Sequence, residues 1–522
     1  MSEPASQARA RDLSAVAQEH AVARRFDQAA ACFEQALAML PGDPDLLLQL
    51  SYMESLAGRY RLAHRYALQA AVRHTRQPEV VKELLARLRT FNEIPTMSAC
   101  IERLLPMSGI PIPLLITIAA QLTYAGQPEK AILFLDEAAR GDPDYPPTLL
   151  SRGHVLIYLG RFDEAAADLA RVLRRAPQLA QGYWLQSQVR RQSQDDNHVR
   201  QIVAQLQVPQ RTVQDQALLG FALHKELDDL GRHDEAWHAL VSGCASKRAA
   251  LRYDAEQNTR MFDGLLRFMP RASSTHDASS HSTAPVFIVG MHRSGTTLLE
   301  QLLDGHSDVA GQGELYDFTS AMRYATDHHC AGVMDARLAE RAMDVDFGEV
   351  GQRYLAGVAW RLKGERFFVD KLPSNFLNAG FICEALPRAK ILHMVRDPME
   401  TCFSNLRELF SEANPYSYDQ LELAGFFNQY RKLMAHWHAR YPGRILDVDY
   451  ARLTREPEHE LRRVCDFMGI TFEPSMLQLQ DRRRGVVTAS AVQVRGGIQA
   501  QDTPKWRAYE KHLQPLRRGL GG

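Results

Sequence analysis

Apolar positions in the first half of the chain recur with the spacing of amphipathic helices, and one short turn returns at a fixed interval. The turns end at Phe26, Tyr60, Pro128 and Phe162, which are 34, 68 and 34 residues apart. Three residues after each of them stands an alanine: Ala29, Ala63, Ala131 and Ala165. Small residues at one phase of a period of about 34 predict pairs of helices that pack closely together.

Other residues keep the same phase. Prolines stand where the second helices should end, at Pro44, Pro78 and Pro146. The period skips one register at Ile94, where the repeat is degenerate, and a diverged copy ends near residues 231–236. This pattern resembles the tetratricopeptide family and implies an all-α solenoid over residues 10–268. The concave face of such a solenoid either has no binding role or receives a protein partner, and we favour the partner.

The hydrophobic pattern changes after residues 271–284, a Ser/Thr/His-rich stretch without periodicity that predicts a linker. The remaining chain, residues 285–522, alternates short apolar runs with helical stripes, and this order predicts an α/β domain with a mostly parallel sheet. The strand-like runs lie at residues 285–289, 366–370, 389–395 and 444–453. An active site is expected where such strands end.

Composition and charge exclude several classes of protein. The 62 basic residues balance 62 acidic ones, which argues against a nucleic-acid partner and requires any anion site to be local. The seven cysteines are scattered and form no CxxC pair, so a reducing compartment is expected. No stretch approaches the roughly 18 apolar residues of a membrane span, and residues 1–12 lack the apolar core of a signal peptide. We therefore expect a cytoplasmic protein without a membrane span.

A glycine-bounded loop follows the first strand-like run directly. Residues 290–297 read GMHRSGTT and lead into a helical stripe of leucines. Between a strand and a helix, backbone amides and the helix dipole bind an anion. A nucleotide triphosphatase carries a lysine after the last glycine, but this chain has Thr296 there and its cation, Arg293, inside the loop. The loop predicts a P-loop-like phosphate cradle, and an arginine with two hydroxyls can hold a 5′-phosphosulfate there without a metal.

The stretch from Gly290 to Glu314 resembles the 5′-phosphosulfate motif of sulfotransferases, in particular the tyrosylprotein sulfotransferases and the bacterial tetratricopeptide-containing sulfotransferases. The resemblance implies 3′-phosphoadenosine-5′-phosphosulfate as donor and 3′-phosphoadenosine-5′-phosphate as product, with no metal. It assigns the donor's contacts to loop residues Arg293, Ser294, Gly295, Thr296 and Thr297.

The resemblance also implies the catalytic residues. The family places a glutamate general base 21 residues after the loop arginine, and this spacing falls on Glu314. A lysine after the second strand-like run meets the leaving phosphate in similar enzymes, and Lys371 occupies that place. Glu314, Lys371 and Arg293 are therefore the expected catalytic set.

Similar enzymes hold the 3′-phosphate with an arginine and a serine eight residues apart, as Arg396 and Ser404 are. The family often has another arginine twelve residues after the first, but here Glu408 stands there and Arg407 precedes it. A family tyrosine near the donor corresponds to Tyr450, although a tyrosine that packs against the sheet explains this position equally well.

A last family segment closes over the 3′ side of the donor. Ser490, Lys505 and Trp506 resemble its residues. Between them, relatives usually have an Arg-x-Pro-Ile-Tyr-like stretch, whereas residues 495–499 read RGGIQ. The conformation of this loop is therefore not predicted.

These features together predict a sulfotransferase that moves a sulfuryl group from the donor to an acceptor hydroxyl. A peptide tyrosine, a glycan hydroxyl and a small metabolite are open as acceptors. Two other functions are weighed against this one: a P-loop nucleotide kinase, and a repeat adaptor that binds nucleotide without turnover. His436 and His438, two apart in a predicted helix, face different sides, so they are not expected to form a metal pair.

Overall fold

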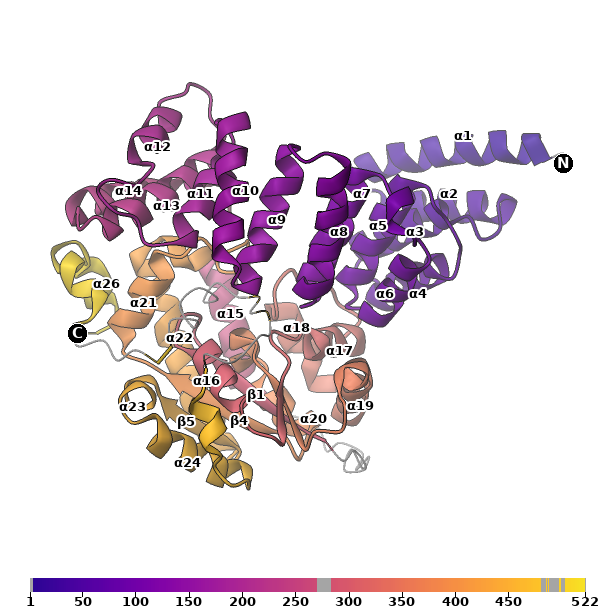
Figure 1. Cartoon of the computed structure of the whole chain (residues 1–522). Coiled ribbons are helices and arrows are strands. Elements are labelled where there is room, and N and C mark those ends of the chain that lie inside the picture. Colours follow the sequence, from indigo (N-terminus) through magenta and orange to yellow (C-terminus); the bar gives the residue numbers. More distant parts are fainter. Residues whose placement is uncertain are drawn as a thin grey trace. The chain divides into compact units, whose positions relative to one another are not determined.

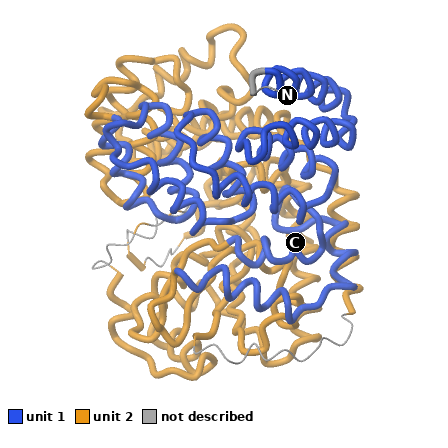
Figure 2. Tube along the Cα trace, turned by 90° about the vertical axis from the view of Figure 1, so that its right-hand side faces the viewer, with its two compact units in different colours: residues 1–138, 270–276, 316–360 blue, residues 139–269, 277–315, 361–522 orange. Residues whose placement is uncertain are grey.

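The computed structural model describes residues 3–269, 283–479 and 503–521, together with residues 485, 487, 497 and 498. The predicted linker at 271–284 lies almost wholly outside these residues. The described chain divides into two units, which Figure 2 distinguishes by colour. The first unit holds residues 3–138 and 316–360, and the second holds residues 139–269, 283–315 and 361–521. Each unit therefore combines repeat helices with a part of the C-terminal half.

The first unit begins with consecutive helices that match the predicted repeats (Figure 1). They are α1 (Glu3–Val22), α2 (Phe26–Met39), α3 (Pro44–Leu56), α4 (Tyr60–Ala71), α5 (Pro78–Thr90), α6 (Ile94–Glu102), η1 (Met107–Gly109), α7 (Ile112–Tyr124) and α8 (Pro128–Gly141), whose last residues belong to the second unit. Ala29 and Ala63 are fully buried, as the close packing of paired helices requires. The predicted repeat structure is confirmed.

The prolines have a different role from the predicted one. Pro44, Pro78 and Pro146 do not end the second helices but begin α3, α5 and α9. Proline suits a first helical position because its missing N–H would have no partner there. Asp43 caps α3 by accepting a hydrogen bond from the Leu46 amide at 3.0 Å.

A segment from the C-terminal half completes the first unit. It forms α17 (Asp317–Ala325), α18 (Ala336–Arg341), η3 (Ala342–Asp344), α19 (Phe347–Val358) and η4 (Ala359–Arg361). Arg61 of α4 donates to the carbonyls of Tyr324 and Ala325 at 2.8 and 2.7 Å. These carbonyls end α17 and have no partner within that helix, so Arg61 caps α17 and complements its dipole. Ser320 donates to the Phe91 carbonyl at 2.9 Å.

The repeats continue in the second unit as α9 (Pro146–Leu159), α10 (Phe162–Arg175), α11 (Ala180–Val189), α12 (Val199–Leu206), α13 (Val213–Asp229), α14 (His233–Ala249) and α15 (Ala255–Leu266). The diverged copy near residues 231–236 is the turn between α13 and α14. These two helices meet backbone to backbone, because a Cβ on Gly220 would lie only 2.7 Å from the Gly243 Cα. Glycine is needed for this approach.

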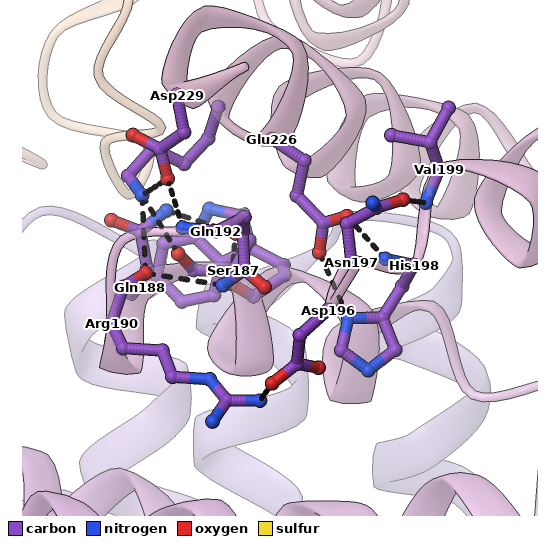
Figure 3. Close-up of polar contacts among 12 residues, drawn as sticks. Ser187, Gln188, Arg190, Gln192, Asp196, Asn197, His198, Val199, Glu226 and Asp229 are labelled. Carbon is purple, nitrogen blue, oxygen red and sulfur yellow. Dashed lines mark hydrogen bonds and ion pairs between the residues drawn. The ribbon is translucent and has the colours of Figure 1, made fainter. Parts of the chain in front are cut away.

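Two carboxylates of α13 hold the loop between α11 and α12 (Figure 3). Asp229 accepts hydrogen bonds from the Lys225 ammonium at 2.5 Å and from the Gln192 amide at 2.9 Å. Glu226, which is fully buried, accepts from the backbone amide of His198 at 2.6 Å. Both ends of the loop are thus fixed to one helix.

The sheet lies in the second unit, and all its strands are parallel, as predicted. It contains β1 (Ala284–Gly290), β2 (Val309–Gly311), β3 (Phe367–Asp370), β4 (Lys390–Val395) and β5 (Ile445–Asp449) in the order β2-β3-β1-β4-β5. Every residue of β1 is buried, which explains its continuous apolar sequence. The sequence did not predict β2, which has three residues.

The helices of the C-terminal part are α16 (Thr296–Leu303), η5 (Pro373–Phe376), α20 (Ala379–Ala385), α21 (Pro398–Leu406), η6 (Pro415–Tyr418), α22 (Gln420–Arg440), α23 (Tyr450–Arg455), α24 (Pro457–Met468), η7 (Pro474–Leu477), η8 (Lys505–His512) and α26 (Gln514–Gly519). Alternate strand residues face opposite sides of the sheet. Ile288 and Leu392 pack with α16 and α24 on one face, whereas His393 faces α22 on the other. Among the described helices, none has the length and hydropathy to cross a membrane.

Candidate active site

The glycine loop connects β1 to α16 and curls through left-handed backbone conformations. The φ angles are +150° at Gly290, +66° at Arg293 and +105° at Gly295. A side chain at Gly290 would meet the Met394 carbonyl oxygen at 2.8 Å, so the neighbouring strand also requires glycine there. Ser294 closes the loop by donating its hydroxyl hydrogen to the Met291 carbonyl at 2.7 Å. Turns of this kind, at the start of a helix, direct backbone amides toward an anion.

Arg293 belongs to the loop, and its side chain is almost entirely buried. Its Nε donates to the Ser404 hydroxyl at 3.3 Å, and its Nη1 lies 3.6 Å from Oε2 of Glu408. Burial lowers the pKa of the Arg293 guanidinium and raises the pKa of the Glu408 carboxyl, and the attraction between the two groups opposes both shifts. Glu408, which replaces an arginine of the family, is therefore the acidic neighbour of the loop arginine.

Arg396 directly follows β4 and is hydrogen-bonded to the loop. Its Nη1 donates to the Arg293 carbonyl at 3.1 Å, and its Nε donates to Glu400 at 2.9 Å. The guanidinium carbon lies 4.3 Å from the ring centroid of Tyr450, within the range of a cation–π interaction. Tyr450 in turn lies against Gly295, where a Cβ would come within 2.4 Å of the ring. Tyr450 thus packs against Gly295 and Arg396, two residues that are expected to bind the sulfuryl donor.

Glu314 and Lys371 form an ion pair at the C-terminal end of β3. The ammonium of Lys371 donates to Glu314 Oε1 at 2.7 Å. The lysine side chain is 0% exposed and the glutamate side chain 30% exposed, so one face of the pair remains open. The amide of Lys371 donates to the Gly313 carbonyl at 2.9 Å, which fixes the segment that carries Glu314.

Glu300, on α16, holds the same segment from the other side. Its Oε1 accepts a hydrogen bond from the Gly313 amide at 2.7 Å, and the residue is 2% exposed. Glu300 was not predicted from the sequence, although a glutamate within the apolar run TTLLEQLL indicates a buried charge with a partner. A charged residue seldom occupies such a helix face unless a partner compensates for its burial.

His292 lies beside both cations of the loop region. Burial, and then the charges of Lys371 and Arg293, lower the pKa of His292 to about 4. Its Nε2 lies 3.4 Å from the Ser374 hydroxyl, while its buried Nδ1 has no hydrogen-bond partner among the described residues. The Asn405 side chain donates to the His292 carbonyl at 2.7 Å and ties the loop to α21. The imidazole is thus neutral near pH 7.

The remaining predicted residues differ in their positions. Thr296 and Thr297 are buried in the first turn of α16, next to the loop. Lys505 and Trp506 begin η8, and the charge nearest in effect on Lys505 is Arg407, which lowers the pKa of that lysine. The positive charge of Arg407 thus acts on Lys505. Ser490 lies outside the described residues.

Comparison with known proteins assigns families to two parts of the chain. Residues 285–474 match the model of the sulfotransferase family, and residues 122–189 match a tetratricopeptide repeat. The C-terminal part of the chain is therefore a sulfotransferase-family domain, and the N-terminal part carries tetratricopeptide repeats.

The relatives include a protein of Aquifex aeolicus described as uncharacterized, which is 30% identical over 397 residues, covering 73% of this chain and 51% of that protein. A putative protein-tyrosine sulfotransferase of Caenorhabditis briggsae is 25% identical, covering 42% of this chain and 80% of its own length. Protein-tyrosine sulfotransferase 2 of Gallus gallus is 25% identical, covering 38% and 54%. The chain thus spans about half the length of the Aquifex and Gallus relatives.

Among solved structures, the sulfotransferase domain of the Synechococcus PCC 7002 olefin synthase is 17% identical with a TM-score of 0.30. The match covers 46% of this chain and 98% of the olefin synthase domain.

Proposed function

We propose that this protein transfers a sulfuryl group from 3′-phosphoadenosine-5′-phosphosulfate to an acceptor hydroxyl. The observation that carries the proposal is the Glu314–Lys371 pair, at 2.7 Å, at the strand end of a sulfotransferase-family domain that also holds a glycine loop with a buried arginine. A carboxylate for the acceptor proton and two cations for the leaving phosphate are the groups that this transfer needs.

Each of these side chains has a separate task in the proposed reaction. Glu314 accepts the proton of the acceptor hydroxyl as its oxygen forms a bond to sulfur. The bond between sulfur and the 5′-phosphate oxygen breaks at the same centre, and its electron pair stays on the phosphate. Lys371 and Arg293 stabilise that negative charge, and their burial strengthens the effect. Because these cations supply the positive charge, we propose no metal in this step.

The 3′-phosphate is assigned to Arg396 and Ser404. Arg396 is hydrogen-bonded to the carbonyl of Arg293, and Ser404 to the guanidinium of Arg293. The three polar groups therefore lie close together. Such a cluster suits a donor that carries phosphates on both sides of its ribose. Ser294, Gly295, Thr296 and Thr297 belong to the proposed 5′ side. Tyr450, Ser490, Lys505 and Trp506 remain predictions for the residues that enclose the donor.

A protein tyrosine is the acceptor that we favour, because the relatives from Caenorhabditis and Gallus are named protein-tyrosine sulfotransferases. The repeats would then bind the acceptor protein or another protein partner. All seven cysteines are unpaired, which supports the expected cytoplasmic location.

Binding and turnover measurements test the proposal together. The product of the donor, 3′-phosphoadenosine-5′-phosphate, should stabilise the protein by about 2.7 kcal/mol at about 100 times its dissociation constant. AMP, which lacks the 3′-phosphate, should stabilise the protein less. Arg293→Ala should weaken binding of the donor product. Glu314→Gln should preserve binding and lower turnover by roughly 10²–10⁴-fold, whereas Glu458→Gln, at an exposed glutamate, is the control.

The two alternatives give different results in the same assays. A nucleotide kinase would be stabilised by ATP with magnesium rather than by the donor product. An adaptor without turnover would show no labelled product from radiolabelled donor and cell extract. Equal turnover in Glu314→Gln and the unmodified protein would remove Glu314 from its role as base.

A further inference from the structure

Two histidines and an aspartate from three different elements converge at the β5 edge of the sheet. His393 on β4 and Asp447 on β5 are direct neighbours in the strand register. His438 comes from the last turn of α22. The Nδ1 atom of His393 and the Nε2 atom of His438 each lie 2.7 Å from the same oxygen, Oδ1 of Asp447. The three potential ligand atoms all lie within 4.8 Å of one another.

The orientation of His393 is fixed by a second contact. Its Nε2 is hydrogen-bonded to the hydroxyl of Tyr430, a buried residue of α22. The two rings meet edge to face, with centroids 5.6 Å apart. A histidine that binds a metal usually has its other ring nitrogen held by such a partner, which sets the tautomer and the ring plane. The Nδ1 atom of His393 therefore points steadily toward Asp447.

The cluster is closed on one side and open on the other. His393 is 6% exposed, whereas the side chains of His438 and Asp447 are 33% and 55% exposed. A metal ion could enter from solvent on that side, and a water molecule could complete its coordination there. The protein would then supply three of four ligands.

We propose that His393, His438 and Asp447 bind a divalent transition metal of the Zn²⁺ type. Two imidazoles with one carboxylate suit zinc and its neighbours, whereas magnesium and calcium prefer sites made of oxygen ligands alone. Ligands about 2.0–2.1 Å from a tetrahedral zinc lie about 3.3 Å apart. The two nitrogen–oxygen distances would lengthen by about half an ångström, and the exposure of His438 and Asp447 leaves room for this shift.

The competing explanation is a hydrogen-bonded network in which Asp447 accepts from both histidines. That network needs a proton on Nδ1 of His393. The metal site needs the proton on Nε2, donated to Tyr430, so that Nδ1 offers its lone pair. The two explanations therefore predict different ligand shells and different responses to metal.

The test uses the full-length, untagged protein, stripped with a chelator and titrated with Co²⁺ and then Zn²⁺. We expect one Co²⁺ per chain, with the visible absorption of a four-coordinate site, and displacement by Zn²⁺. His438→Ala and Asp447→Asn should each weaken binding at least about tenfold, in line with the loss of a ligand. The control is His459→Gln, at an exposed histidine of α24, which should bind like the unmodified protein.

Several results would overturn the proposal. One is equal affinity in Asp447→Asn and the unmodified protein. Another is a thiolate-to-cobalt absorption band, which would place the metal on the free cysteines instead. Circular dichroism checks the fold of each variant. If a variant is misfolded, X-ray absorption of the zinc-loaded unmodified protein decides: two imidazoles and oxygen in the shell support the site, and sulfur or an all-oxygen shell contradicts it.

Discussion

The contact between Gly295 and Tyr450 can be tested by adding a single methyl group. Gly295→Ala places a Cβ in a backbone conformation with φ of +105°, which costs about 1–2 kcal/mol in a residue other than glycine. The same Cβ would lie 2.4 Å from Cδ2 of Tyr450, so the ring or the loop must move. Overpacking of this kind costs about 1–3 kcal/mol. We expect a total loss of about 2–5 kcal/mol in the free energy of unfolding.

A second glycine separates the two contributions. Gly443 has φ of +75° and open space where a Cβ would stand, so Gly443→Ala measures the backbone cost alone. Tyr450→Ala removes the ring and leaves only the end of the flexible Met394 side chain, at 3.3 Å, near a Cβ at position 295. In that background Gly295→Ala should cost about as much as Gly443→Ala. Urea unfolding followed by circular dichroism gives the free energies for this double-mutant cycle. An equal cost of Gly295→Ala with and without the Tyr450 ring would show that the ring does not restrict this position.

Three further predictions concern Glu300, Arg396 and a buried histidine of the repeat helices. Glu300→Ala removes a charge-assisted bond to the Gly313 amide, worth about 1.5–3 kcal/mol, and should lower kcat more than Glu300→Gln does while calorimetry finds little change in donor-product affinity. Arg396→Lys should weaken binding of 3′-phosphoadenosine-5′-phosphate in the same calorimetry. A lysine ammonium cannot make both the contact with the Tyr450 ring and the hydrogen bond to the Arg293 carbonyl that the guanidinium makes. Burial lowers the pKa of His224, on α13, from 6.5 to about 4. As the pH falls, this histidine is therefore protonated in the unfolded chain before it is protonated in the folded one. Up to about 3 kcal/mol of the free energy of unfolding is lost between pH 6.5 and 4. His224→Leu should reduce the slope of the unfolding free energy against pH in that range. An unchanged slope would contradict a lowered pKa of His224 as its cause.

Much of the fold was predictable because its strands and repeats have strong local patterns. β1, β3 and β4 are buried or mostly buried apolar runs, whereas β5 is only partly buried; the predicted positions of all four strands are confirmed. β2 was missed because three residues are too few to form a pattern. The docking of residues 316–360 on the repeats was also missed. It depends on contacts such as that of Arg61 with the Tyr324 carbonyl, 263 residues away, which no local pattern reveals.

The candidate site was predictable in its motif and less so in its surroundings. The loop around Arg293 has a recognisable spacing, whereas the roles expected of Glu314 and Lys371 came only from the family resemblance. Their ion pair, between residues 57 positions apart, was not predicted. The role of Glu408 could not be read from the sequence, because a glutamate in place of an arginine gives no sign that it lies beside Arg293. The contact of His438 with Asp447 on β5 depends on the packing of α22 against the sheet, which the local sequence does not reveal.

The packing of α17 on α4 also bears on how this protein can have evolved. Residues 316–360 lie in sequence between β2 and β3 of the sheet, yet Arg61 of the repeats caps the helix they contain. A gene that lost its repeat region would remove the Arg61 hydrogen bonds from that helix end and leave its packing surface without a partner. The two sequence halves are therefore not exchangeable modules, and substitutions on α4 and α17 must be compatible with each other in every descendant.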